Sequence, residues 1–255
     1  IVEGSYEKKR CDVYHITSIL EKLDESENPS VIDRLVFIEF ALFRHLEHQM
    51  DITNLCLKKE LSNKPELMIQ IVELAYPPDD GNIEELEGSA PENRRLLAEC
   101  AFHIIHLGHN LISFNSKEGE FEGDRMKYYI KELYRLAEER KRSKVINYVV
   151  GEILGDIPRD EKYPPIALCQ IVEDLHNDVV DEAIYARIYN SRGVTCRAYN
   201  EGGDQERYIV AKFEKFKERT RTRYPRISEI FNRLIKVYKN EATRCDNEAI
   251  ITDLE

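Results

Sequence analysis

Apolar residues recur every three or four positions along almost the whole chain, and this period constrains the fold more than any other feature, because it is the period of an α-helix packed on one face. The segment 35–43 is apolar nearly all round, which predicts a central helix. The 11 glycines and 9 prolines are too few turn formers for a many-stranded β-protein. We therefore predict an all-α protein, an irregular helical bundle or solenoid of about nine to ten helices.

The periodic segments have recognisable boundaries. Ser30 with Asp33 three residues later is a capping-box-like start of the second helix, and Pro65 suits the first turn of another. Pro225 lies between the last two long apolar stripes, which predicts that the chain ends in an αα-hairpin. The expected helices before that hairpin cover 6–24, 29–49, 52–62, 65–76, 89–106, 124–142, 145–154, 165–175 and 178–190.

Charge is unevenly distributed along the chain. The net charge is −11, yet residues 207–244 contain 12 Lys/Arg and 4 Asp/Glu, which gives 12 − 4 = +8 and leaves −11 − 8 = −19 for the rest. Pro158 and the pair at 164–165 interrupt the helical pattern between these parts. We expect an acidic helical body over 1–157 and a C-terminal subdomain over 158–255, with a loop at 192–207 and a basic hairpin at 204–246.

Composition also bounds the class of protein. No apolar run approaches the roughly 20 residues that cross a bilayer, so we expect no membrane segment. The chain starts with Ile and no signal-peptide pattern follows, which suggests a part cut from a longer chain. Six cysteines lie far apart without a CxxC pair, so reduced thiols and a cytoplasmic location are expected.

The residues with catalytic or metal-binding chemistry form no recognisable constellation. His103, His106 and His109 share a helical spacing, but the third rotates away and no HExxH pattern accompanies them. Cys196 lies near arginines without a neighbouring histidine, and Glu39 reads as a structural carboxylate bound to an arginine or a helix end. We predict that the protein is not an enzyme and holds neither metal nor cofactor.

The segment 192–207 concentrates glycines and polar residues in an order that helix packing does not require. Gly193 suits a left-handed helix end, and Asp204 suits the cap of the next helix, so the segment can be a structural connector. Alternatively, Arg192, Arg197 and Arg207 beside open backbone amides could bind a phosphate or carboxylate. The residue pattern is compatible with both a structural connector and an anion-binding loop.

The basic hairpin is a second candidate binding surface. Arg219, Arg221 and Arg223 concentrate positive charge where its two helices meet. These residues could bind nucleic-acid phosphates, could bind an acidic protein partner, or could dock the hairpin on the acidic body of the same chain.

Three elements carry a resemblance to a known group of proteins: Asn190-Ser-Arg-Gly-Val-Thr195, Glu201-Gly-Gly-Asp-Gln-Glu-Arg207, and the Tyr-Pro-Arg start of the last helix. They resemble a C-terminal helical region of large, uncharacterised bacterial multidomain proteins. The resemblance implies an all-α fold, a bacterial origin, and a sensor, scaffold or docking role. We therefore expect a non-catalytic protein-interaction or scaffolding domain that contacts other domains of its parent chain or another protein, with nucleic-acid binding through the hairpin as the alternative.

Overall fold

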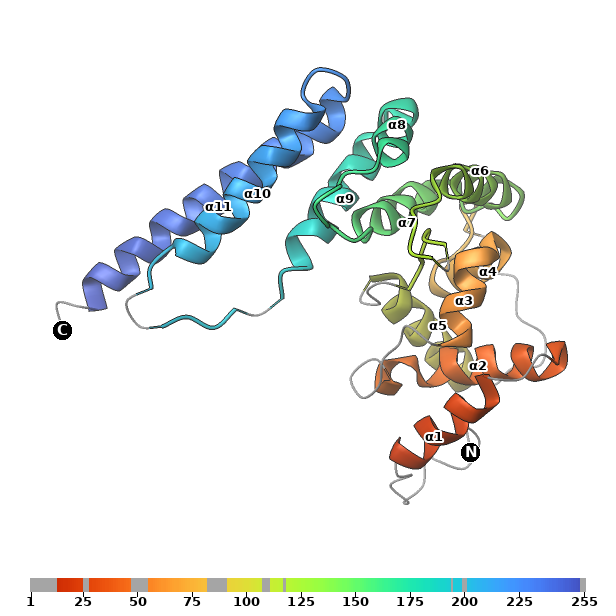
Figure 1. Ribbon diagram of the computed structural model, residues 1–255. Helices are drawn as coiled ribbons and strands as arrows, with labels where there is room; N and C mark the ends of the chain where they lie inside the picture. Colours follow the sequence, from red (N-terminus) through yellow and green to blue (C-terminus); the bar gives the residue numbers. More distant parts are fainter. Residues whose placement is uncertain are drawn as a thin grey trace. The chain divides into compact units, whose positions relative to one another are not determined.

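A computed structural model describes residues 13–24, 28–46, 55–81, 91–106, 111–116, 118–193, 195–198 and 201–252. The chain divides into two compact units, Ile1–Ile146 and Asn147–Glu255. The boundary falls inside a helix, and the expected division at residue 158 stays a prediction. The helices are α1 Val13–Asp24, α2 Pro29–Leu46, α3 Cys56–Asn63, α4 Pro65–Ala75, α5 Pro91–His106, α6 Gly123–Glu139, α7 Ser143–Gly155, α8 Ile166–Leu175, α9 Asp178–Asn190, α10 Asp204–Thr220 and α11 Pro225–Thr252 (Figure 1).

The all-α prediction is confirmed for the described residues, which contain eleven helices and no strand beyond one isolated bridge between Asn115 and Phe121. The eleven helices correspond to the nine segments expected before the hairpin and the two helices of the hairpin, so the total lies just above the predicted nine to ten. In the described part of the chain, no helix is long and apolar enough to cross a bilayer.

Two predicted helix ends are wrong in detail. The side chain of Asn28, not Ser30, caps α2, because its Oδ1 accepts a hydrogen bond from the Ser30 N–H at 3.1 Å. Asp204 is the first residue of α10, whose N-cap is Gly203 without a side-chain cap. The last helix also continues past the predicted hairpin end at 246, to Thr252. The first two residues of the helix expected over 89–106 and the first residues of the first predicted helix lie outside the described residues.

In the first unit, α2 is the central helix and contacts α1, α3 and α5, while α4 contacts α3, α5 and α6. Glu39 of α2 is buried, and its Oε2 accepts a hydrogen bond from the Leu57 backbone N–H at 2.6 Å, in the first turn of α3. A carboxylate at this position satisfies a free N–H and complements the helix dipole. The interpretation of Glu39 as a structural carboxylate at a helix end is confirmed.

In the second unit, α7 crosses α9 at very short range. An added Cβ at Gly151 would lie 2.4 Å from the Ala183 Cβ, and one at Gly155 would lie 2.7 Å from the Arg187 Cβ. Arg187 is itself buried and pairs with Glu152 at 3.3 Å and Asp156 at 3.1 Å on α7. The two glycines let the helix backbones approach, and the ion pairs compensate the buried charges between the same helices.

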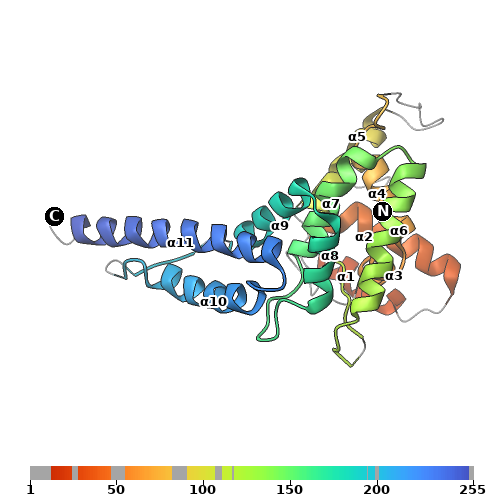
Figure 2. The same ribbon diagram turned by 90° about the horizontal axis from the view of Figure 1, so that it is seen from above.

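The C-terminal hairpin packs on the rest of this unit. Figures 1 and 2 both show α10 beside α11, and α11 also contacts α8 and α9. Rings of Phe213, Phe216 and Phe231 meet in the hairpin with centroids 5.8–6.0 Å apart, and Tyr163 packs 5.1 Å from Phe216. The predicted αα-hairpin is therefore confirmed, and it is a packed part of the second unit.

Candidate functional site

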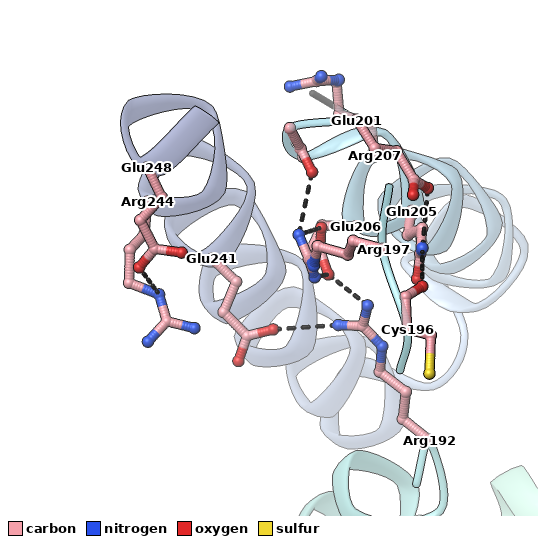
Figure 3. A network of polar contacts seen from close by, with 12 residues as sticks. Arg192, Cys196, Arg197, Glu201, Gln205, Glu206, Arg207, Glu241, Arg244 and Glu248 are labelled. Atoms are coloured by element: carbon pink, nitrogen blue, oxygen red, sulfur yellow. Dashed lines mark hydrogen bonds and ion pairs between the residues drawn. The ribbon is translucent and has the colours of Figure 1, made fainter. Parts of the chain in front are cut away.

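The connector between α9 and α10, residues 191–203, returns the chain to the far end of the hairpin, and its arginines point inward to one carboxylate (Figure 3). Gly193, three residues after the last residue of α9, has φ +68°, the left-handed conformation predicted for it, and its N–H donates to the Asn190 carbonyl at 3.3 Å. Thr195 to Ala198 are exposed and form no regular secondary structure. Side-chain contacts, and not the backbone hydrogen bonds of a helix or a sheet, therefore hold this segment in place.

Glu206 is the carboxylate at the centre of these contacts. It is fully buried, in the first turn of α10, and binds both Arg192 and Arg197. The Arg197 Nη1 donates to Glu206 Oε2 at 3.0 Å and to the Gly202 carbonyl at 3.0 Å. Burial works against the charge, but hydrogen bonds from Arg197 and then Arg192 outweigh it and lower the pKa of Glu206 below 4.5.

Arg192 extends the network to α11. Its Nη1 donates to Glu241 Oε2 at 3.3 Å, and its guanidinium lies 5.5 Å from the ring centre of Tyr238. The Tyr189 hydroxyl donates to the same carboxylate. One arginine of the connector therefore contacts α10 and α11 together.

Arg207 links the start of α10 to α11 by ion pairs that are exposed to solvent. It pairs with Asp204 at 2.7 Å and with Asp246 of α11 at 2.8 Å. Asp246 also accepts a hydrogen bond from the Gly203 N–H at 2.8 Å, where an added Cβ on Gly203 would lie 2.5 Å from the Ala242 carbonyl oxygen. All three arginines proposed for anion binding are thus bound to carboxylates of the same unit, which supports the connector interpretation of the segment.

The three hairpin arginines differ from one another. Arg219 donates to the backbone carbonyls of Glu161 at 2.6 Å and Tyr163 at 3.2 Å, so it anchors the hairpin to the segment before α8. Arg221 lies 3.6 Å from the exposed Glu218. Arg223 is exposed, and its side chain has no hydrogen bond or ion pair within the described residues.

Much of the remaining basic charge docks the hairpin on α8 and α9. Arg226 pairs with Asp178 at 2.7 Å and Asp181 at 2.5 Å, while its backbone N–H donates to Glu173 at 2.7 Å. Arg233 pairs with Glu182 at 2.5 Å. Part of the positive charge of the hairpin is therefore paired within the second unit, on α8 and α9, and docking on the predicted acidic body over 1–157 stays a prediction.

A surface that combines tyrosine and arginine side chains lies along the contact between α9 and α11. We call the partly exposed residues Tyr185, Tyr189, Arg233, Val237 and Arg244 the α9–α11 seam. The Arg233 guanidinium lies 4.3 Å from the ring centre of Tyr185, which stacks on Tyr189 at 6.3 Å. The seam ends in a shallow hollow of about 330 Å³ lined by Tyr189, Val237, Asn240, Glu241 and Arg244. Sequence reasoning missed this surface because its residues come from two helices about 50 positions apart.

The remaining candidates have structural partners. His106 Nε2 lies 2.6 Å from the Tyr76 hydroxyl and His103 lies beside Phe43, while His109 lies outside the described residues. Cys196 is exposed, and its carbonyl accepts a hydrogen bond from Gln205. Across the described ranges, no group of three or more His, Cys, Asp or Glu side chains could hold a metal ion.

Comparison with protein-family models, curated proteins and solved structures finds no match for this chain. The resemblance to a C-terminal region of large bacterial proteins therefore stays an expectation from the sequence.

Proposed function

We propose that the chain is a non-catalytic protein-interaction domain and that the α9–α11 seam is its binding surface. The observation that carries this proposal is the row of Arg233, Tyr185 and Tyr189 at the surface, in which the Tyr185 ring lies between the guanidinium and the second ring. Tyrosine and arginine are enriched among the residues that dominate binding energy at protein interfaces, because they combine a large contact area with polar groups. Arg233 is paired with Glu182, as the connector arginines are with Glu206, Glu241 and Asp246, so the contact area of the seam and not a free charge carries the proposal.

The test is site-specific photo-crosslinking from the seam. A benzophenone amino acid is placed at Glu182 or Asn240, which are exposed on or beside the seam, and at Tyr128 of α6 as a control that is 66% exposed. Crosslinking is carried out in the parent organism. We expect one discrete protein adduct from both seam positions and none from Tyr128. Equal labelling at all three positions, or no adduct from the seam, contradicts the proposal.

Nucleic-acid binding remains a second candidate, because Lys215, Arg223 and Lys236 are exposed without a side-chain partner in the described part of the chain. Two observations weigh against it. Glu214 and Glu218 lie among these cations on the same hairpin, and Arg219 is engaged by carbonyl groups.

Fluorescence anisotropy of labelled DNA and RNA at low and near-physiological salt distinguishes the two functions, because phosphate binding weakens steeply with salt. The variant to use changes Lys215, Arg221 and Arg223 to Glu and leaves the anchoring Arg219 intact. Salt-sensitive binding that this variant abolishes would establish the nucleic-acid function. We expect no such binding.

A further inference from the structure

The end of α9 leaves part of α11 uncovered. The two helices run in the same direction, from the contact of Asp178 with Arg226 to the contact of Tyr189 with Glu241. α9 ends at Asn190, but α11 continues to Thr252. The stripe of α11 that faces α9 continues into Arg244 and Glu248, which Figure 3 shows on the same side of the helix as Glu241.

The hollow lies where α9 ends beside α11, and its walls and rim differ in chemistry. The Tyr189 ring and the Val237 side chain supply apolar surface, and most of the exposed lining is apolar. Glu241 also lines the hollow, and each of its oxygens accepts one hydrogen bond, from Arg192 and from the Tyr189 hydroxyl. The hollow therefore offers an apolar wall beside a carboxylate whose charge is offset by Arg192.

The rim offers unused hydrogen-bond donors. Arg244 is 70% exposed and forms a long ion pair of 3.8 Å with the exposed Glu248, while its guanidinium donates no hydrogen bond within the described residues. The Asn240 amide is exposed, and within the described residues it has no hydrogen-bond partner. One guanidinium and one amide beside an apolar wall complement a carboxylate that is carried next to an aliphatic side chain.

We propose that this hollow binds an acidic segment of a partner protein, with an aliphatic side chain against Tyr189 and Val237 and an adjacent carboxylate on Arg244 and Asn240. The proposal rests on the proposed interaction function and names its partner class. The volume of about 330 Å³ is at the lower limit of ligand sites, so it fits one or two side chains rather than a large ligand. Arg244 is the cation that lines the hollow, and its guanidinium favours a carboxylate of an acidic partner.

The experiment is a titration of the ¹³C-methyl-labelled full chain with a blocked hexapeptide, Gly-Gly-Leu-Glu-Gly-Gly, observed through the Val237 methyl signals. The same peptide with Gln in place of Glu is the ligand control. We expect saturable shifts of the Val237 signals with the Glu peptide. The Arg244→Gln variant should bind it about tenfold more weakly, which corresponds to about 1.4 kcal/mol.

Lys236→Gln is the matched protein control, because Lys236 is an exposed cation of the same helix that does not line the hollow. It should leave the affinity unchanged. Three results would overturn the proposal: no Val237 shift, equal binding of the Gln peptide, or equal loss in both variants. An oligonucleotide that shifts Val237 and loses affinity in Arg244→Gln would also overturn it, in favour of a nucleic-acid ligand.

The two experiments distinguish failure of the proposed acidic-segment site from failure of the proposed interaction function. A crosslinked adduct at the seam that persists in Arg244→Gln, together with unshifted Val237 signals, leaves an interaction surface without this ligand. Loss of both the adduct and the shift rejects the interaction function itself.

Discussion

Arg197 of the connector donates a hydrogen bond to the buried carboxylate of Glu206 at 3.0 Å. The arginine lies in an exposed segment without regular structure, and the glutamate lies in the first turn of α10 with no exposed surface. Because a buried carboxylate without compensation is costly, this pair and the pair with Arg192 couple the path of the connector to the stability of the hairpin.

We expect Glu206→Ala to destabilise the chain by about 1–3 kcal/mol, because Arg192 and Arg197 lose their shared acceptor, while Arg192 keeps Glu241 and the Arg197 side chain is partly exposed. Urea unfolding followed by circular dichroism measures the change. Glu248→Ala is the control, since that side chain is 65% exposed. A loss as small as that of the control would mean that the network has little influence on stability.

The same carboxylate predicts a pH dependence. The pKa of Glu206 is lowered in the folded chain, so its contribution is fully present above its ordinary value of 4.5 and is lost as the pH falls through the folded pKa. The stability difference between the wild type and Glu206→Gln should therefore be largest near neutral pH and shrink in acid. Urea midpoints of both proteins across this range test the sign, which a pH-independent difference would contradict.

Gly151→Ala should destabilise the second unit by about 1–3 kcal/mol, because its Cβ would meet the Ala183 Cβ at 2.4 Å and the Val180 carbonyl oxygen at 2.7 Å. The double variant with Ala183→Gly should recover part of the loss, since it removes the first of these contacts. Thermal unfolding of the single and double variants gives the coupling. Strict additivity would argue against the close crossing of α7 and α9.

Glu39→Leu should cost about 1–3 kcal/mol, because the Leu57 N–H at the start of α3 loses its acceptor in a buried place. Glu39→Gln should cost less, since its amide oxygen can still accept the hydrogen bond. The comparison uses urea unfolding of the full chain. Equal losses would indicate that the charge of Glu39 matters more than its hydrogen bond.

Thiol reactivity should separate the cysteines. Cys196 is exposed, whereas burial raises the pKa of the Cys169 thiol to about 12 and raises that of Cys100. Under native conditions, titration with a thiol reagent should lose one fast-reacting group in Cys196→Ser compared with wild type. An unchanged fast phase would show that Cys196 is protected.

The sequence by itself determined the helices, because the period of apolar residues along the chain is a local property that each segment carries. The central helix at 35–43, the left-handed Gly193 and the hairpin around Pro225 follow from such local signals. The sequence also marked the connector as unusual and left its role open between a structural link and an anion site.

Only the tertiary structure decided how the charges pair. Arg192 meets Glu241 across 49 positions and Arg207 meets Asp246 across 39, and no local rule predicts such pairs. The close approach at Gly151 and the hollow beside Tyr189 likewise depend on how two distant helices cross. Helical periodicity indicates which face of a segment is buried, but the partner of that face is set by packing, which minimises unpaired charge and empty volume over the whole unit.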